Sequence, residues 1–152
     1  MDDDLRGADM SHFVTQEASV SLAWATPGFT GNPATSDYFD LTLGHNDLSI
    51  SSTNATTLSL PAGTYHVRAT LGGTKPTQGS YVDYQWELGG SLVGNRAGWD
   101  TNAGNDKVTT EYAEAVFSVN SATALRLFCN LAAGANVIQD EYSGVVIRGA
   151  SL

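Results

Sequence analysis

The sequence predicts an all-β protein, an antiparallel jelly-roll β-sandwich of roughly eight to ten short strands. Runs in which apolar and polar residues alternate recur along the 152 residues, separated by glycine, proline or asparagine. No stretch keeps apolar residues at helical spacing for the length of a helix. Only 15% of the residues are charged, so the solvated faces carry mainly hydroxyl and amide groups. Residues 1–12 are expected to form a flexible acidic arm, and residues 13–152 a jelly-roll domain.

Three strands are expected in the first third of the chain. Val20, Leu22 and Trp24 alternate with small residues within 14–24, and Pro27-Gly28 is expected to end that strand. A second run covers 38–43, and the turn residues 44–47 separate it from a short strand that starts at 48–50.

The segment 58–71 carries the pattern that the rest of the chain repeats. Apolar and polar residues alternate over 58–60 and again over 65–71, as they do in half-buried strands. Pro61 lacks the N–H that a central ladder needs, and Gly63 allows a backbone bend. The segment is therefore predicted to form two strands joined by a short turn.

Further strands are expected after this segment, beyond a loop at 72–79. Residues 81–88 alternate most clearly, and Gly89-Gly90 is typical of a tight hairpin turn into 91–93. Residues 94–107 are polar and glycine-rich, which predicts the longest exposed loop. The remaining strands are expected over 111–119, 125–131 and 142–148.

Charge and composition exclude several classes of partner. The formal net charge is -9, which opposes binding to nucleic acid phosphates. No segment has the apolar length of a membrane span, and no basic and apolar leader opens the chain. Cys129 is the only cysteine, so an intrachain disulfide is excluded. Because Cys129 shares the alternating apolar face of 125–131 with Leu131, a buried and unreactive thiol is predicted.

Three short motifs follow one another from residue 52 onward. Residues 60–67 read Leu-Pro-Ala-Gly-Thr-Tyr-His-Val, residues 84–94 hold a strand and a glycine turn, and residues 142–147 read Tyr-Ser-Gly-Val-Val-Ile. Together they resemble the trimeric jelly roll shared by tumour necrosis factor (TNF)-like ligands and the globular heads of complement-type proteins. The family patterns are P-x-G-x-Y, L-x-x-N-G and F-S-G-F-x-L. The second motif departs from its pattern, because Gly89-Gly90 forms the turn here.

The resemblance implies a homotrimer, in which aromatic and aliphatic side chains pack around a threefold axis. The expected subunit-interface residues are the aromatic residues on the less apolar faces of their segments, namely Tyr81, Tyr112, Phe128 and Tyr142. The alternative is that these side chains fill the core of a monomeric sandwich or lie singly on its surface.

The sequence lacks features that secreted members of this family usually carry: a collagen-like stalk, a coiled coil, a signal peptide and a disulfide. It therefore most resembles stalkless members on virus particles, that is, bacteriophage capsid decoration proteins and fibre heads. The expected function is that of a homotrimeric capsid decoration, or cement, protein on a phage head, located on the virion after assembly in the host cytoplasm. The arm is expected to bind the major capsid protein or another virion component, through Asp2, Asp3, Asp4, Leu5 and Arg6.

No catalytic or metal-binding motif is found in the sequence. His12, His45 and His66 are far apart and form no ligand pair. A Gly-x-Ser-x-Gly nucleophile elbow and a His-Glu-x-x-His motif are both missing. A non-enzymatic protein without a metal or cofactor is therefore expected.

The alternative function is a receptor- or carbohydrate-binding head of a viral fibre or a bacterial surface protein. The expected loop 94–107 is its candidate site, because an aromatic ring beside a cation and amides suits a protein partner or a host-surface glycan. The candidate ligand residues are Arg96, Trp99, Asp100, Asn102 and Asp106. Oxygen-bearing residues in this loop are spaced as in calcium loops, but the downstream bidentate Glu is missing, so a turn-rich exposed loop is the stronger expectation.

Overall fold

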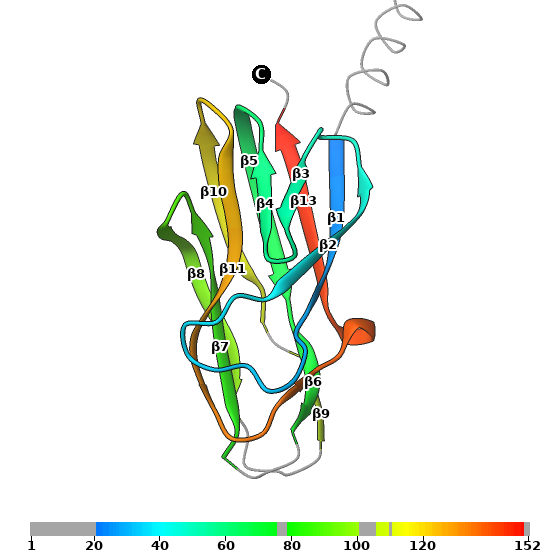
Figure 1. Cartoon of the computed structure of the whole chain (residues 1–152), viewed down its shortest axis with the longest axis vertical. Coiled ribbons are helices and arrows are strands. Elements are labelled where there is room, and N and C mark those ends of the chain that lie inside the picture. Colours follow the sequence, from blue (N-terminus) through cyan, green and yellow to red (C-terminus); the bar gives the residue numbers. More distant parts are fainter. Residues whose placement is uncertain (1–20, 76–78, 101–105, 110, 151–152) are drawn as a thin grey trace, which may run out of the picture.

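A computed structural model describes residues 21–75, 79–100, 106–109 and 111–150. These residues form short strands and one 3-10 helix, η1 (Figure 1). The elements are β1 (Ser21–Gly28), β2 (Asp40–Asn46), β3 (Ser51–Asn54), β4 (Thr57–Leu60), β5 (Gly63–Thr70), β6 (Gly72–Lys75), β7 (Tyr81–Leu88), β8 (Ser91–Asp100), β9 (Asp106–Thr109), β10 (Ala113–Val119), β11 (Thr123–Ala133), β12 (Val137–Ile138), η1 (Asp140–Tyr142) and β13 (Gly144–Ala150). No helix among the described residues is long and apolar enough to cross a membrane.

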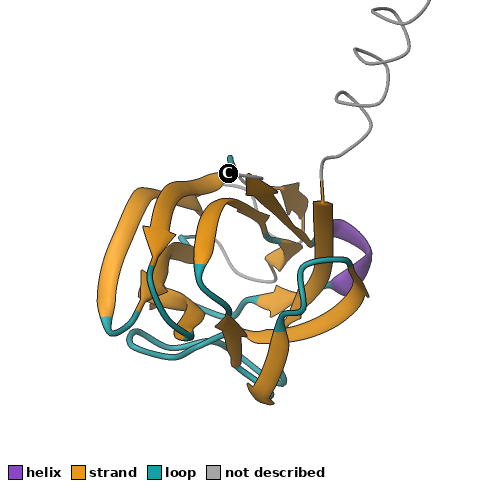
Figure 2. Ribbon diagram, turned by 90° about the horizontal axis from the view of Figure 1, so that it is seen from above, coloured by secondary structure: helices purple, strands orange, loops and turns teal. Residues whose placement is uncertain are grey.

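Two five-stranded antiparallel sheets form the sandwich. Sheet A has the strand order β10-β5-β13-β1-β2, and sheet B has the order β3-β4-β11-β7-β8. A small third sheet, β12-β6-β9, lies at one end of the molecule (Figure 1). Seen along the long axis, the strands surround one common core (Figure 2). The predicted antiparallel jelly-roll sandwich is confirmed.

The segment 58–71 joins the two sheets. Its first strand, β4, pairs with β11 in sheet B, and its second, β5, pairs with β10 and β13 in sheet A. Leu58, Leu60 and Val67 are fully buried between the sheets. The predicted turn at Pro61-Ala62 therefore carries the chain from one layer of the sandwich to the other.

The core is built from side chains of complementary size. Sheet A buries several alanines and valines beside larger residues such as Leu41, Tyr65 and Ile147, whereas sheet B contributes the two largest fully buried side chains, Trp86 and Tyr84. Buried sheet A residues include Ala23, Ala25, Val67, Ala69, Ala113 and Ala115, and buried sheet B residues include Leu58, Tyr84, Trp86, Leu125 and Leu127. Close packing of large against small side chains fixes the separation of the sheets.

Hydrogen bonds tie the edge of sheet A at β10 to sheet B. Trp86 in β7 donates its indole N–H to the carbonyl oxygen of Ala113 at 2.9 Å. The side-chain amide of Asn95 in β8 donates to the carbonyl of Tyr112 at 2.8 Å and accepts from the backbone N–H of Glu114 at 2.9 Å. The Asn95 side-chain amide thus bonds to the backbone beside β10 as a peptide group of a neighbouring strand would. It links β8 to β10.

The hairpin turn at Gly89-Gly90 is confirmed between β7 and β8. Both glycines have a positive φ, 56° and 88°, which is the conformation that such a turn requires. The first strand ends at Pro27-Gly28 as expected, although both residues still belong to β1. Beyond Ala25 only β2 pairs with β1, so one side of the strand needs no N–H from Pro27.

The expected exposed loop over 94–107 is wrong in its described part. Residues 94–100 belong to β8 and residues 106–107 to β9, while residues 101–105 lie outside the described residues. Gly94 and Gly98 are typical of a loop, but here they serve close packing: a Cβ at Gly94 would meet the carbonyl of Glu114, and one at Gly98 would meet Asp83. Gly94 thus allows β8 to approach β10 of the other sheet, and Gly98 allows β8 to approach β7 within sheet B.

Two smaller expectations also need correction. Residues 72–75 form β6 rather than a loop, although Gly72 and Gly73 give no alternating pattern.

Leu131 does not share the buried face of Cys129, because the register of β11 against β7 shifts between these two residues. That β-bulge turns Leu131 outward, where 41% of its surface is exposed.

The predicted burial of Cys129 is confirmed, since none of its surface is exposed. Burial, followed by the nearby Asp37 carboxylate, raises the pKa of the thiol to about 11. Since the thiolate is the reactive form, we expect the folded protein to resist a thiol reagent such as dithionitrobenzoate at about pH 8. Addition of guanidinium should release one reactive thiol per chain. Full labelling of the folded protein before any loss of its circular dichroism signal would contradict the expectation.

Candidate assembly surface

The outer face of sheet A presents two cross-strand rows of side chains. Pairing registers place Glu114, Arg68, Val146 and Trp24 side by side across β10, β5, β13 and β1. The next row consists of Val116, His66, Arg148 and Leu22. These residues alternate with the buried small residues of the same strands, so their side chains point away from the core.

This face carries the two most exposed large hydrophobic side chains of the described residues. Val116 in β10 is 73% exposed and Trp24 in β1 is 54% exposed. Tyr112, just before β10, is 47% exposed and lies against the same face, because the Arg68 guanidinium stacks on its ring at 3.7 Å. Exposed aromatic and aliphatic groups gathered on one face are typical of protein–protein contacts.

An ionic cluster lies on β10 and β5, at one edge of this face. The Glu114 carboxylate accepts a hydrogen bond from Nε of Arg68 at 2.7 Å and lies 3.2 Å from Nε2 of His66. The Arg68 bond, followed by the His66 bond, lowers the pKa of Glu114. Because Arg68 also stacks on Tyr112, the four side chains hold one another in place.

The lowered pKa of Glu114 predicts a pH dependence with a defined sign. A carboxyl group whose pKa is lowered by folding stabilises the folded protein above its unfolded pKa, and that stabilisation is lost as pH falls through the folded pKa. We therefore expect the stability difference between the wild type and Glu114→Gln to be largest near neutral pH and to vanish in acid. Urea unfolding at several pH values measures it. A difference that stays constant or grows on acidification would contradict the assignment.

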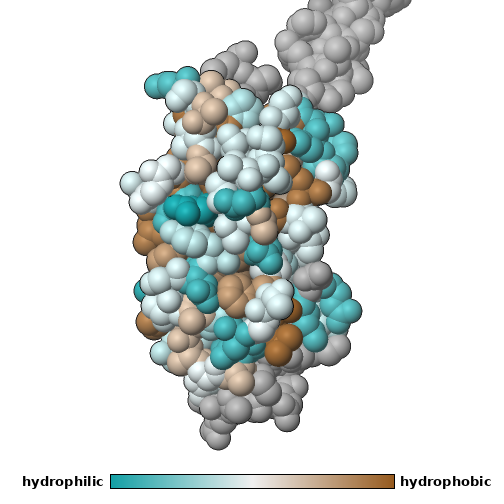
Figure 3. All heavy atoms as spheres, in the orientation of Figure 1, coloured by the Kyte–Doolittle hydropathy of each residue, from teal (hydrophilic) through white to brown (hydrophobic). Residues whose placement is uncertain are grey.

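On the outer face of sheet B, polar and charged side chains pair with one another. Glu87 accepts hydrogen bonds from Arg126 and from the Tyr38 hydroxyl, the latter at 3.0 Å. Asp83 forms an ion pair with Arg96 at 3.1 Å. In the view of Figure 3, hydrophobic residues appear as small separate patches among hydrophilic ones.

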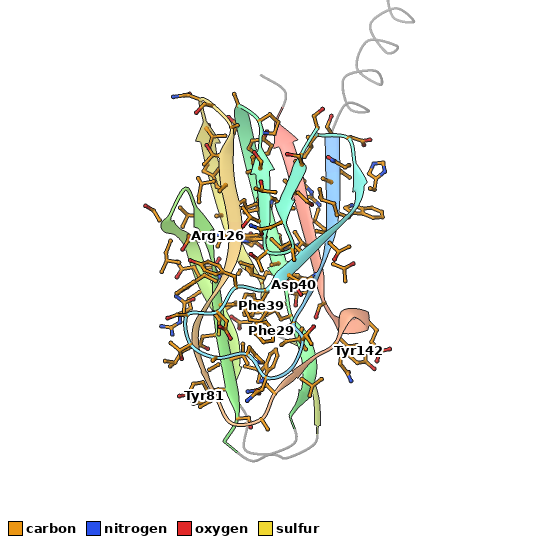
Figure 4. All side chains as sticks on the ribbon, in the orientation of Figure 1. Phe29, Phe39, Asp40, Tyr81, Arg126 and Tyr142 are labelled. Atoms are coloured by element: carbon orange, nitrogen blue, oxygen red, sulfur yellow. The ribbon has the colours of Figure 1, made fainter. Side chains whose placement is uncertain are left out.

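The four expected interface residues do not gather on one surface. Phe128 lies on the outer side of sheet B, half-buried, with its ring centroid 5.4 Å from that of Tyr38. Tyr112 lies on sheet A, and Figure 4 shows Tyr81 and Tyr142 on opposite sides of the molecule. Only Tyr112 thus belongs to the outer face of sheet A.

The expected ligand residues are also divided by the fold. Trp99 is buried, with only 5% of its surface exposed, and its indole N–H donates to Oδ1 of Asn136 at 3.2 Å. Its ring is therefore a core group and cannot stack on a sugar. Arg96 is exposed and pairs with Asp83. The backbones of Asp100 and Asp106 belong to β8 and β9, and Asn102 lies outside the described residues.

The expected partner-binding arm, Asp2 to Arg6, also lies outside the described residues, so its role stays a prediction. Trp24, Val116 and the Glu114 cluster are surface features that the sequence patterns did not predict. One signal was available: alanines alternate with large residues at 23 and 25 and again at 113 and 115. When small residues face the core, the large residues between them face outward.

Comparisons with known proteins agree with this topology. No family model and no curated protein matches the sequence. Among solved structures, Eiger TNF from S. frugiperda superposes with a TM-score of 0.67 at 9% identity, covering 87% of this chain and 93% of that chain. The fold is a TNF-like jelly roll. Murine APRIL at pH 8.0 gives a TM-score of 0.62 at 8% identity, and at pH 5.0 a TM-score of 0.61 at 11% identity, each covering 87% of this chain and 100% of that chain. At such low identity the similarity establishes the fold alone.

Proposed function

We propose that this TNF-like jelly roll is a non-enzymatic homotrimeric head that assembles through the outer face of sheet A. The observation that carries the proposal is the exposure of Trp24 and Val116 on a sheet face that also carries an ordered ionic cluster on β10 and β5. Burial of such a face between subunits would remove apolar surface from water and leave the Glu114 cluster paired.

Within this class, we propose the specific role of a capsid decoration protein on a phage head. The support is the resemblance to stalkless virion proteins and the acidic run Asp2 to Asp4, which suits a basic site on a major capsid protein. The trimer would sit on the capsid surface and the arms would reach the shell. On this proposal the protein resides on the virion.

Light scattering of the purified protein tests the assembly. A mass of three 16.0 kDa chains supports the homotrimer. A monomer at all accessible concentrations would overturn the proposal of an assembling head.

Deletion of residues 1–12 tests the decoration role separately. We expect the truncated protein to keep the same number of subunits as the wild type. It should no longer cosediment with capsids of the phage that the protein decorates, because the arm supplies the contact. A variant with Asp2, Asp3 and Asp4 all changed to Asn keeps the arm length and removes its charge. Truncated protein that binds capsids as well as the wild type would exclude the arm as the contact.

A further inference from the structure

A polar hollow of about 510 Å³ lies where the segment after β1 turns back into β2. Its lining consists of Thr26, Gly28, Phe29, Thr30, Asp40 and Thr42. Register places Thr26 directly opposite Thr42 and Gly28 opposite Asp40. Since Gly28 adds no side chain, the space beside the Asp40 carboxylate stays open. In Figure 4, Phe29 and Asp40 both lie near this turn.

The polar side chains of this hollow are unpartnered within the part of the chain that the structure describes. There, neither the Asp40 carboxylate nor any of the three threonine hydroxyls takes part in a hydrogen bond or ion pair with another side chain. The carboxylates of Glu87, Asp83 and Glu114 are paired, whereas among the described residues those of Glu111 and Glu141 are not. The hollow thus combines one strong acceptor with hydroxyls that can donate or accept.

Phe29, which packs against the core, also contributes to the lining of the hollow. Phe29 is half-buried, and its ring packs edge-on against the buried Phe39, with centroids 5.9 Å apart and planes at 68°. This contact holds the Phe29 ring in a fixed orientation. The hollow therefore offers an anchored apolar ring beside unpartnered polar groups, within the size range of small-molecule sites.

We propose that this hollow binds one neutral pyranose unit of a glycan. Adjacent sugar hydroxyls can donate to the Asp40 carboxylate, the threonine hydroxyls can bond to the remaining oxygens, and the C–H face of the ring can pack on Phe29. The Asp40 charge and the net charge of -9 oppose an anionic ligand. A metal ion would lack ligands, since no three His, Cys, Asp or Glu side chains of the described residues form a metal site.

The proposal goes beyond assembly and decoration. The hollow lies on β1 and β2 at one edge of sheet A, on the same outer face as Trp24, because Thr26 follows Trp24 at the next outward position of β1. Val116 lies on β10 at the opposite edge of that sheet. It also replaces Trp99 and its neighbours as the candidate sugar site, at a different place in the fold.

Amide chemical shifts of the full chain test the proposal. The probes are the methyl pyranosides of glucose, galactose and mannose, their N-acetylated amino forms, and sialic acid as an anionic comparison. We expect at least one neutral sugar to shift the amides of residues 26–30 and 40–42 in a saturable manner, and sialic acid to leave them unchanged. Absence of such shifts for every neutral sugar, or tighter binding of sialic acid at these residues, would overturn the proposal.

Variants then assign the binding to the polar groups. Asp40→Asn keeps the side-chain volume, and we expect it to weaken binding about tenfold because the charged acceptor is lost. Thr42→Val keeps the shape and strand preference of the residue, and we expect a loss of about fivefold. Asp47→Asn is the matched control, because that carboxylate lies outside the hollow and pairs with His45 at 2.8 Å.

The mass of each variant separates this proposal from the assembly proposal. Both hollow variants should keep the wild-type mass and circular dichroism spectrum. If both bind the sugar as tightly as the wild type, the hollow is not the site. A monomeric wild type that still binds through Asp40 would overturn the assembly proposal and leave this one intact.

Discussion

Trp86→Ala should destabilise the folded protein by about 3–5 kcal/mol, the range for removing a fully buried tryptophan. Trp86 has no exposed surface, and it projects from sheet B onto the small residues of sheet A. The substitution opens a cavity that alanine neighbours cannot fill. It also removes the indole donor to the carbonyl of Ala113, which links β7 to β10 across the sandwich. Such a loss is a large part of the stability of a typical domain.

Urea unfolding followed by circular dichroism measures this loss, at one fixed protein concentration because assembly would couple to folding. Trp86→Phe keeps most of the apolar volume and removes only the donor, so it should cost less than Trp86→Ala. Leu92→Ala is the surface control, since Leu92 is 46% exposed on β8. A Trp86→Ala protein within about 1 kcal/mol of the wild type would show that the sandwich closes around the missing side chain and leaves no cavity.

Strands that bury large residues could be predicted from the sequence. In β5 and β7 apolar residues recur at every second position, and the two faces of each strand differ sharply in polarity. Burial between two sheets selects this pattern directly, so both strands were located to within a few residues. The hairpin glycines between β7 and β8 were equally informative, because few other residues adopt their φ values.

The first strand, which buries alanines beside a large outward residue, could be located in part but not oriented. In β1 the buried residues are Ala23 and Ala25, and the large Trp24 between them faces outward. The reason lies in sheet B, whose tryptophan and tyrosine side chains occupy much of the core and favour small residues opposite them. This size relation couples residues that are far apart in sequence, and alternation within one strand does not show it.

The candidate sites depend on the same long-range information. Glu114 meets Arg68 only because β10 pairs with β5 in one particular register. Asp40 lies opposite Gly28 because β2 folds back on β1 after a segment with little regular structure. Trp99 suggested a ligand because it lies near Arg96 and amides in a glycine-rich segment typical of an exposed loop, yet those glycines serve close packing of β8. The sequence shows which residue types are present, whereas the residues that contact them in space can be identified only from the fold.

Trp24→Glu should convert the proposed trimer into monomers without unfolding the chain. Trp24 is 54% exposed in the single chain, so its removal costs the monomer little. In an assembly through sheet A it would be a large aromatic contact, the residue type that most often dominates binding energy. The glutamate would also place an unpaired charge against an apolar surface, which is strongly unfavourable when water is excluded.

Light scattering of Trp24→Glu should therefore give the mass of one 16.0 kDa chain, where the wild type gives that of three. Leu92→Glu is the matched control, because it adds the same charge at a residue of similar exposure on sheet B. It should keep the mass of the wild type. If Leu92→Glu dissociates the protein and Trp24→Glu does not, assembly runs through sheet B, and the polar pairs of Glu87 and Asp83 become the contact surface. If neither substitution changes the mass, the subunits contact one another through edge strands. The outer faces of sheets A and B then take no part in assembly.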